Sequence, residues 1–178
     1  MAGAVPRRPA SHEEGLITTA RLRLELFTLR RARQTLRDRR ALAEELDATL
    51  PEDWPNEEFR PVLPLLIQEW EVTGGSDGWT WIVLSRAPDI AIGTLGTKGG
   101  PDPTGAVEIG YGLIPGARGR GFMTEAVLAM LDELREVGIL RVTAETDPEN
   151  LPSHRVLERC GFAREADVDG MWRWGRAL

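Results

Sequence analysis

Hydrophobic and polar residues alternate at the start and in the middle of the chain. Residues 21–26, Arg-Leu-Arg-Leu-Glu-Leu, predict a half-buried strand. Three more strands are expected over residues 79–84, 90–98 and 106–114, where aromatic and β-branched side chains are frequent. Because only short turns separate these three strands, they are expected to form an antiparallel meander.

Other segments space their apolar residues at helical intervals. A helix is expected over residues 29–46, and a second one over 57–72, interrupted near its two prolines. The strongest pattern covers residues 121–137, where apolar side chains recur every three or four positions up to a terminating glycine. A short last helix is expected to start at Asn150, a good N-cap residue, and to end at Gly161.

The remaining elements complete a mixed α/β order. Residues 140–146 predict a buried strand, and residues 162–168 and 171–177, joined by Asp-Gly, predict a hairpin. Residues 1–16 have little periodicity and are expected to form a loose leader. The sequence therefore predicts a single α/β domain over residues 17–178.

Composition narrows the function classes. With 178 residues, 42% of them hydrophobic and 28% charged, the chain suits one globular domain rather than a disordered segment. Its net charge of −6 argues against nucleic acid or an anionic membrane as partner. One cysteine and two histidines make a zinc site unexpected, and no metal is predicted. No apolar run approaches the roughly 18 residues that span a bilayer, so the cytoplasm is the expected location.

The richest chemistry lies in the turn that opens the strongest predicted helix. Arg118, Gly119, Arg120 and Gly121 follow the strand over 106–114. Glycines let main-chain N–H groups converge, and a helix N-terminus and arginines add positive charge, so the turn should bind a phosphate or a diphosphate. Neither common nucleotide motif fits, because the turn lacks the lysine of a P-loop and has Thr124 where the dinucleotide fingerprint requires glycine.

The segment Arg118-Gly119-Arg120-Gly121-Phe122-Met123 resembles the diphosphate signature Gln/Arg-x-x-Gly-x-Gly/Ala of the GNAT superfamily of acetyl-CoA-dependent N-acetyltransferases. Met123 departs from that signature, which has a small residue there. The flanking residues 108–113 and 124–126 resemble the Rim branch, which acetylates the N-termini of ribosomal proteins.

Two distant segments extend the resemblance. Residues 150–162, Asn-Leu-Pro-Ser followed later by Gly-Phe, resemble a second segment of the Rim branch, and residues 21–24 resemble its first strand. Together the similar segments span residues 17–177. The two main motifs occur in the right order and at the right spacing, which is more specific than either motif alone.

The resemblance implies a fold and a cofactor site. The fold would be a mixed, mostly antiparallel twisted sheet of about seven strands with about four helices, and a splay between the fourth and fifth strands. Acetyl-CoA would lie in that gap, with its pantetheine along the main chain of Leu113 and Ile114. The other implied cofactor-binding residues are Arg118, Gly119, Arg120, Gly121, Phe122, Met123, Asn150 and Ser153.

Amine acetylation requires an unprotonated amine and a proton for the departing thiolate. Glu108 lies on the strand beside the implied thioester and is the candidate general base, although a solvent-facing strand glutamate is an equal interpretation. Leu157 occupies the position of the tyrosine that many superfamily members use as general acid. In the Rim branch a serine is the suggested substitute, and Ser153 matches it; the alternative is a first-turn serine bonded to the backbone.

Four further side chains are interpreted individually. Trp54, on a loop before the second helix, and Tyr111 are candidates for contact with the acceptor, although strand alternation equally makes Tyr111 a core residue. His154 is expected to be solvated, because adjacent helix residues point about 100° apart and Ser153 would face the thioester. Cys160 is expected to be a small buried hydrophobe.

The acceptor is implied only at the level of the branch. A protein or peptide N-terminal α-amine is the first choice, and a small amine, such as an aminoglycoside or an amino-acid-like compound, is the second. A catalytically silent CoA-binding module and a dinucleotide-binding oxidoreductase are the alternatives of other classes. Homodimers occur in this superfamily, so a homodimer stays open.

Overall fold

The computed structural model describes residues 15–73 and 79–178, and these residues form one sheet covered by helices on both faces. Within them the sheet has eight strands in the order β1-β2-β3-β4-β5-β6-β8-β7. Most of the expected leader, and the predicted turn over 74–78, lie outside the described residues. The strands are β1 Ile17–Thr18, β2 Leu22–Leu26, β3 Thr80–Arg86, β4 Asp89–Thr97, β5 Ala106–Leu113, β6 Arg141–Thr146, β7 Ala163–Val168 and β8 Met171–Ala177.

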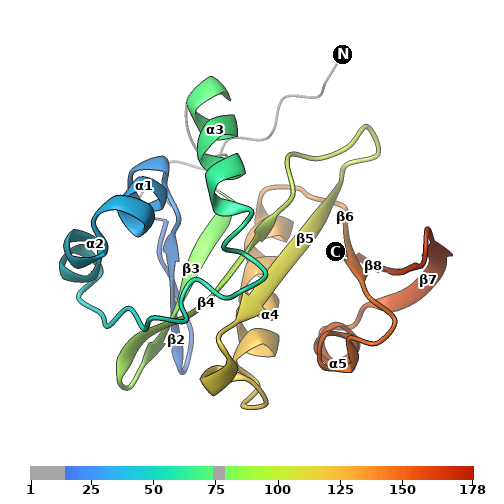
Figure 1. The fold of residues 1–178 in the computed structure, drawn as a ribbon. Helices are drawn as coiled ribbons and strands as arrows, with labels where there is room; N and C mark the ends of the chain where they lie inside the picture. Colours follow the sequence, from blue (N-terminus) through green and yellow to red (C-terminus); the bar gives the residue numbers. More distant parts are fainter. Residues whose placement is uncertain (1–14, 74–78) are drawn as a thin grey trace.

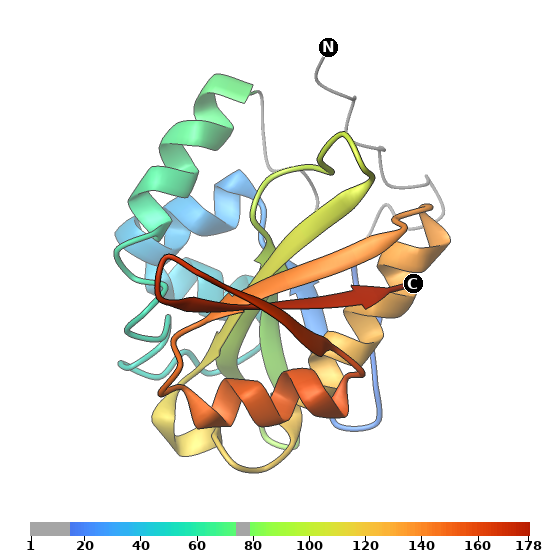
Figure 2. The same ribbon diagram turned by 90° about the vertical axis from the view of Figure 1, so that its right-hand side faces the viewer.

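The helices sort by face. Figures 1 and 2 show α1, α2 and α3 on one side of the sheet and α4 on the other, with α5 beside the last strands. A 3-10 turn, Pro115–Ala117, lies between β5 and α4. The helices are α1 Leu29–Arg37, α2 Arg39–Leu46, α3 Leu63–Thr73, α4 Phe122–Glu136 and α5 Leu151–Arg159.

Two helix predictions need correction. The helix expected over 29–46 is two helices, because Asp38 leaves the helical conformation (φ −152°, ψ 71°) and its carboxylate accepts the N–H of Ala41 at 3.0 Å as the cap of α2. The helix expected over 57–72 starts only at Leu63. A proline disfavours helical geometry in the residue before it, so Pro61 delays the start, whereas Pro64 falls in the first turn, where a helix tolerates it.

The splay predicted between the fourth and fifth strands is confirmed. The structure has the additional short strand β1 before the first predicted strand, so these two strands are β5 and β6. These two strands pair in parallel only from Ala106 with Arg141 to Ile109 with Ala144. Beyond that point β5 stays paired with β4 as far as Leu113, and β6 stays paired with β8 as far as Thr146. The two halves of the sheet therefore diverge after Ile109, and the second half of β5 has an open edge.

Trp54 belongs to the hydrophobic core rather than to the acceptor cleft predicted from its loop. Its side chain is fully buried, its ring lies 6.3 Å from that of Phe27, and its Nε1 donates to the carbonyl oxygen of Gly93 at 3.1 Å. A bulky indole on a short loop is stabilised more by burial and one satisfied N–H than by exposure to solvent. The loop around Trp54 is thereby attached to β4.

Close contact between β4 and β5 gives a stability prediction. A Cβ on Gly93 would lie 2.2 Å from the carbonyl oxygen of Gly112, so Gly93→Ala should lower the free energy of unfolding by about 1–3 kcal/mol. The control is Gly116→Ala, whose Cβ meets no described atom within 4 Å and which should change stability by less than about 0.5 kcal/mol. Urea denaturation measures both, and equal midpoints would contradict the prediction.

Candidate active site

The open edge of β5 presents main-chain groups that no strand pairs. Lys98 N–H donates to Glu108 O at 2.7 Å, and Ile114 N–H donates to Ile92 O at 2.9 Å, so the even-numbered residues of β5 direct their main chain toward β4. Tyr111 and Leu113 must then direct theirs the other way, past the point where β6 has diverged. The main chain of Leu113 therefore faces the open edge, whereas the N–H of Ile114 is already used by β4.

The turn before α4 has the geometry of an anion site. Gly119 and Gly121 have φ angles of 74° and 76°, which favour glycine, and Gly121 is the N-cap of α4 without a side-chain cap from the described residues. Phe122 and Met123 follow at the first positions of the helix, where N–H groups have no intrahelical partner and carry partial positive charge. The turn fits a bound diphosphate on these grounds.

Arg118 points away from this turn. Its Nε donates to Leu113 O at 3.0 Å, and its guanidinium pairs with Glu58 at 3.2 Å. It therefore bridges the end of β5 to the loop before α3. Arg120 remains near the turn, with its guanidinium 4.8 Å from the ring centroid of Phe122. Both arginines were predicted to bind the diphosphate, and of the two only Arg120 has its guanidinium beside the turn.

The guanidinium of Arg21, rather than that of Arg118, lies beside the turn. Its Nε donates to Glu125 at 2.7 Å, its Nη1 donates to the carbonyl oxygen of Arg120 at 2.9 Å, and its guanidinium lies 4.8 Å from the ring centroid of Phe122. Thr19 also donates to Glu125, at 2.6 Å. The sequence signal was present, because residues 21 and 125 both lie in segments that resemble the family, but nothing in the sequence indicates that they meet.

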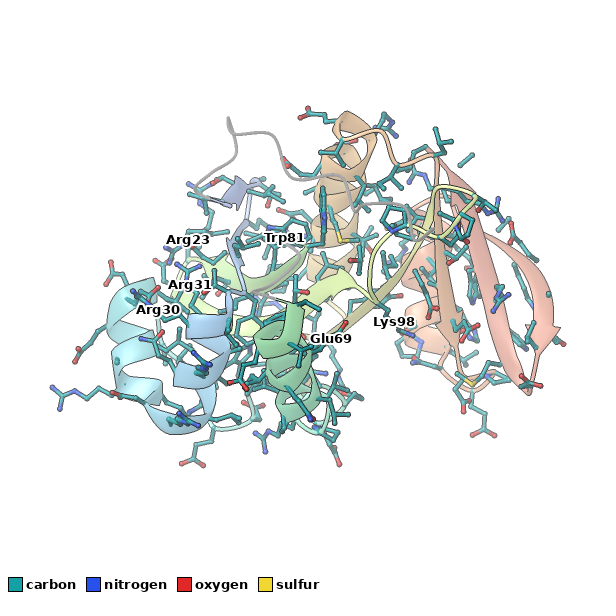
Figure 3. The ribbon with its side chains drawn as sticks, turned by 90° about the horizontal axis from the view of Figure 1, so that it is seen from above. Arg23, Arg30, Arg31, Glu69, Trp81 and Lys98 are labelled. Atoms are coloured by element: carbon teal, nitrogen blue, oxygen red, sulfur yellow. The ribbon has the colours of Figure 1, made fainter. Side chains whose placement is uncertain are left out.

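A cavity of about 510 Å³ opens on the other face of β4 and β5, below α3. Its apolar wall consists of Phe59, Val62, Leu66 and Trp70, and its charged groups are Glu58, Glu69 and Lys98. Figure 3 labels Glu69 on α3 and Lys98 just after β4, on facing sides of this space. The strand side of the cavity is lined mainly by small residues: Thr80, Thr94, Gly96, Thr97, Gly110 and Gly112.

Asn56 shapes the inner end of the cavity. It is 1% exposed, its Nδ2 donates to Glu58 at 2.7 Å, and its Oδ1 accepts from Thr94 at 3.4 Å. Only glycine fits opposite, because a Cβ on Gly112 would lie 2.2 Å from Asn56 Nδ2. The hydrogen bond from Asn56 and the nearby guanidinium of Arg118 outweigh partial burial and lower the pKa of Glu58, which keeps this carboxylate ionised.

Glu108 lies beside this cavity and forms an ion pair with Lys98. Strand alternation puts its side chain on the same face as Gly110 and Gly112, both of which line the cavity. Its side chain is 30% exposed, and it lies one residue before the position where the β5–β6 pairing ends. The candidate base is thus close to the open edge and on the cavity face, but it already has a cationic partner.

Tyr111 connects β5 to α5 across the splay. Its hydroxyl donates to the carbonyl oxygen of Ser153 at 3.3 Å, and burial raises the pKa of the phenol, so Tyr111 keeps its proton. Ser153, half-buried, sits in the first turn of α5, where its N–H donates to Asn150 Oδ1 at 3.2 Å. Asn150 therefore caps α5 with its amide oxygen, as predicted, and is also the residue that the resemblance implies in cofactor binding.

His154 is buried rather than solvated, which corrects the prediction. Its ring stacks on Trp172 at 4.4 Å between centroids, and its Nε2 lies 3.0 Å from the carbonyl oxygen of Asp147. Because a carbonyl can only accept, Nε2 carries the proton. Pairing of β8 with β6 brings Trp172 under α5, a contact that local helix geometry cannot reveal.

Cys160 is buried as expected. Burial raises the pKa of its thiol to about 11, and Sγ lies 3.6 Å from the carbonyl oxygen of Thr124. Among residues 15–73 and 79–178, no group of three or more His, Cys, Asp or Glu side chains is placed to hold a metal ion. No helix in the same part of the chain is both long and apolar enough to cross a membrane.

The comparisons identify the family. The model of the acetyltransferase (GNAT) domain matches residues 21–163, so the chain belongs to this family. It is an acetyltransferase, and enzymes of this family use acetyl-CoA. The open edge of β5 and the uncapped turn before α4 are consistent with that cosubstrate.

The relatives agree on the class. The uncharacterized N-acetyltransferase YjdG of Bacillus subtilis is 28% identical over 149 residues, which are 83% of this chain and 89% of the relative. RimJ of Mycobacterium smegmatis, solved with CoA-disulfide, has a TM-score of 0.58 at 22% identity and covers 88% of this chain and 82% of its own. A ribosomal-protein-S5-alanine acetyltransferase of Vibrio fischeri has a TM-score of 0.58 at 19% identity, with coverages of 91% and 96%. At these two identities, the structural likeness concerns the fold.

Arg21 gives a binding prediction. Arg21→Ala removes the donor that holds the carbonyl of Arg120, so the dissociation constant of CoA should rise by about 10- to 150-fold, as expected for a charged hydrogen bond of about 1.5–3 kcal/mol. Titration calorimetry measures it. The matched control is Arg33→Ala, which breaks an exposed pair with Glu71 on α3 and should leave CoA affinity unchanged. Equal affinities in both variants would contradict the role of Arg21.

Glu125 gives a pH prediction. Partial burial raises its pKa, but hydrogen bonds from Thr19 and Arg21 outweigh burial, and the net pKa is lowered. The stabilisation is then fully present above the unfolded pKa of about 4.3 and is lost as pH falls through the folded value. In thermal melts between about pH 6 and pH 3, Glu125→Gln should lose less stability than the parent chain. If the stability of the variant and of the parent chain fell in parallel with pH, the prediction for Glu125 would be contradicted.

Proposed function

We propose that this chain transfers the acetyl group of acetyl-CoA directly to an N-terminal α-amine of a protein or peptide. One observation carries the proposal: the open edge of β5 and the cavity below α3 meet at the same residues. Gly110, Tyr111 and Gly112 line the cavity, and the main chain of Tyr111 and Leu113 faces the open edge. A donor lying along the edge and an acceptor in the cavity would come together there.

The cosubstrate site is assigned to groups along the open edge of β5 and in the turn before α4. The main chain of Tyr111 and Leu113 binds the pantetheine amides in the way that a sheet edge binds an added strand. The turn from Gly119 to Met123, with Arg120, binds the diphosphate. Arg118 contributes by holding the end of β5 through Leu113, and Asn150 by setting the first turn of α5. When bound, acetyl-CoA supplies the activated acetyl thioester.

The acceptor is assigned to the cavity. Carboxylates on Glu58 and Glu69 attract a cationic amine, and the apolar wall of α3 suits the first side chain of a peptide. The RimJ and ribosomal-protein-alanine acetyltransferase neighbours support a protein N-terminus over a small amine. Glu108, on the cavity face, accepts the proton of the amine, and the hydroxyl of Ser153, at the start of α5, supplies a proton to the departing thiolate.

The two proton-transfer roles are tested by substitution. Glu108→Gln should lower kcat by about 10²–10⁴, and Ser153→Ala should lower it within the same range, because each removes one proton-transfer group. Stopped assays of thiol release from pH 6 to 9 (about the working range of such groups) measure both. The control is Glu44→Gln, which removes an exposed carboxylate paired with Arg40 on α2. An unchanged kcat across pH would remove the role from that residue.

The acceptor class is tested with a matched panel. Peptides with a free α-amine, the same peptides with the α-amine blocked, aminoglycosides and single amino acids are compared by thiol release and by product mass. The proposal expects turnover of free-amine peptides alone. Turnover of small amines alone would show that the proposed acceptor class is wrong. CoA binding without turnover of any amine would indicate a catalytically silent binding module.

A further inference from the structure

Lys98 is the only lysine in the 178 residues, against 21 arginines, and it lines the cavity proposed for the acceptor. Its side chain is 55% exposed, and its ammonium forms an ion pair with Glu108, the proposed base. The amine of an acceptor would have to lie next to the same carboxylate, in the position that the Lys98 amine occupies. The chain thus holds an amine of its own where the reaction requires one.

The position of the thioester follows from the sheet. An arm that binds the open edge at Leu113 and Tyr111 runs toward Ile109, where the pairing of β5 with β6 begins and closes the gap. The reactive end must therefore stop near residues 109–111. Lys98 is next to this point, because a Cβ on Gly110 would lie 3.4 Å from Lys98 Cε. Lys98 and Glu108 both lie on the cavity face there.

We propose that Lys98 is a self-acetylation site: in the absence of a better acceptor, the chain transfers the acetyl group to Lys98 Nζ. The inference rests on the proposed function, since it uses the same placement of thioester and base. An amine held in place reacts at a higher effective concentration than one in solution, so the tether favours Lys98 over a dilute amine.

The transfer balances without any further reagent. Glu108 accepts one proton from the Lys98 ammonium, and the freed lone pair of Nζ forms the C–N bond of an amide. The C–S bond of the thioester breaks, and the thiolate leaves with the electron pair and takes the proton of the Ser153 hydroxyl, which the proton held by Glu108 replaces through solvent. A second proton from the nitrogen passes to solvent, so the products are acetyl-lysine, CoA thiol and one proton.

Acetylation would change the charge of the cavity. The ammonium becomes a neutral amide, so Glu108 loses its cationic partner, while the carboxyl groups of Glu58 and Glu69 still line the wall. A cavity with carboxylates and no lysine should bind a cationic amine more tightly. Self-acetylation would then prepare the cavity for its acceptor by freeing the base.

The test uses the full chain and the fact that trypsin does not cleave after acetyl-lysine. Arg86 and Arg118 are the nearest basic residues on either side, so an unmodified chain gives peptides 87–98 and 99–118, and a chain acetylated on Lys98 gives one peptide, 87–118. The chain is incubated with acetyl-CoA or with CoA, digested and analysed by mass spectrometry. The proposal expects peptide 87–118, heavier by one acetyl group, only after acetyl-CoA.

Two controls separate catalysed from chemical acetylation. The chain unfolded in urea measures the background reaction, and the folded chain should react at least about tenfold faster. Lys98→Arg keeps the charge and the partner of Glu108 but removes the nucleophile, so trypsin should still release peptide 87–98 and that peptide should gain no acetyl group. Equal rates in the folded and unfolded chains would overturn the inference.

A second measurement needs no cosubstrate. Lys98→Gln resembles the acetylated side chain, and titration calorimetry with benzylammonium should give a dissociation constant several-fold lower than in the parent chain. Lys98→Arg should bind benzylammonium as the parent does. Weaker or equal binding by Lys98→Gln would contradict the proposed effect on the cavity.

Failure of this inference differs from failure of the proposed function. If free-amine peptides are acetylated while Lys98 stays unmodified, self-acetylation is wrong and the acetyltransferase assignment stands. If the chain neither binds CoA nor acetylates any amine, the proposed function fails, and Lys98 will also stay unmodified.

Discussion

The early end of the pairing between β5 and β6 determines what the rest of the structure can do. If the ladder continued past Ile109 and Ala144, the main-chain groups of Tyr111 and Leu113 would be satisfied by a neighbouring strand. Because it stops there, β5 has one paired edge and one open edge over the same residues. The turn before α4, and α5, lie around that opening (Figure 1). The cavity below α3 reaches it at Gly110, Tyr111 and Gly112.

Long-range polar contacts then hold the parts around the opening. Arg21 joins the start of β2 to the turn before α4, Arg118 joins the end of β5 to the loop before α3, and Tyr111 joins β5 to α5. Each of these three residues has a hydrogen-bond partner at least 42 positions away in the chain. Specific hydrogen bonds therefore hold the opening from both sides of the sheet. The site is formed before a cosubstrate binds.

Local patterns predicted most of the elements but few of the contacts. Strand alternation, the stripe of α4 and the glycine turn gave the order of strands and helices, because each depends on neighbours in sequence. The break at Asp38 was missed because a capping aspartate inside a helical pattern resembles any polar position. Trp54 and His154 were misplaced because their partners, Gly93 and Trp172, come from strands distant in sequence. The pairing of Lys98 with Glu108 depends likewise on the register of β4 with β5.

The central claim, that the open edge of β5 receives the cosubstrate, is tested most directly by a crystal structure of the chain with CoA. Pantetheine amides should lie within hydrogen-bond distance of the main chain of Tyr111 and Leu113, and the diphosphate should lie at the turn from Gly119 to Met123. CoA bound at another surface, or a β5–β6 ladder that continues beyond Ile109, would contradict it.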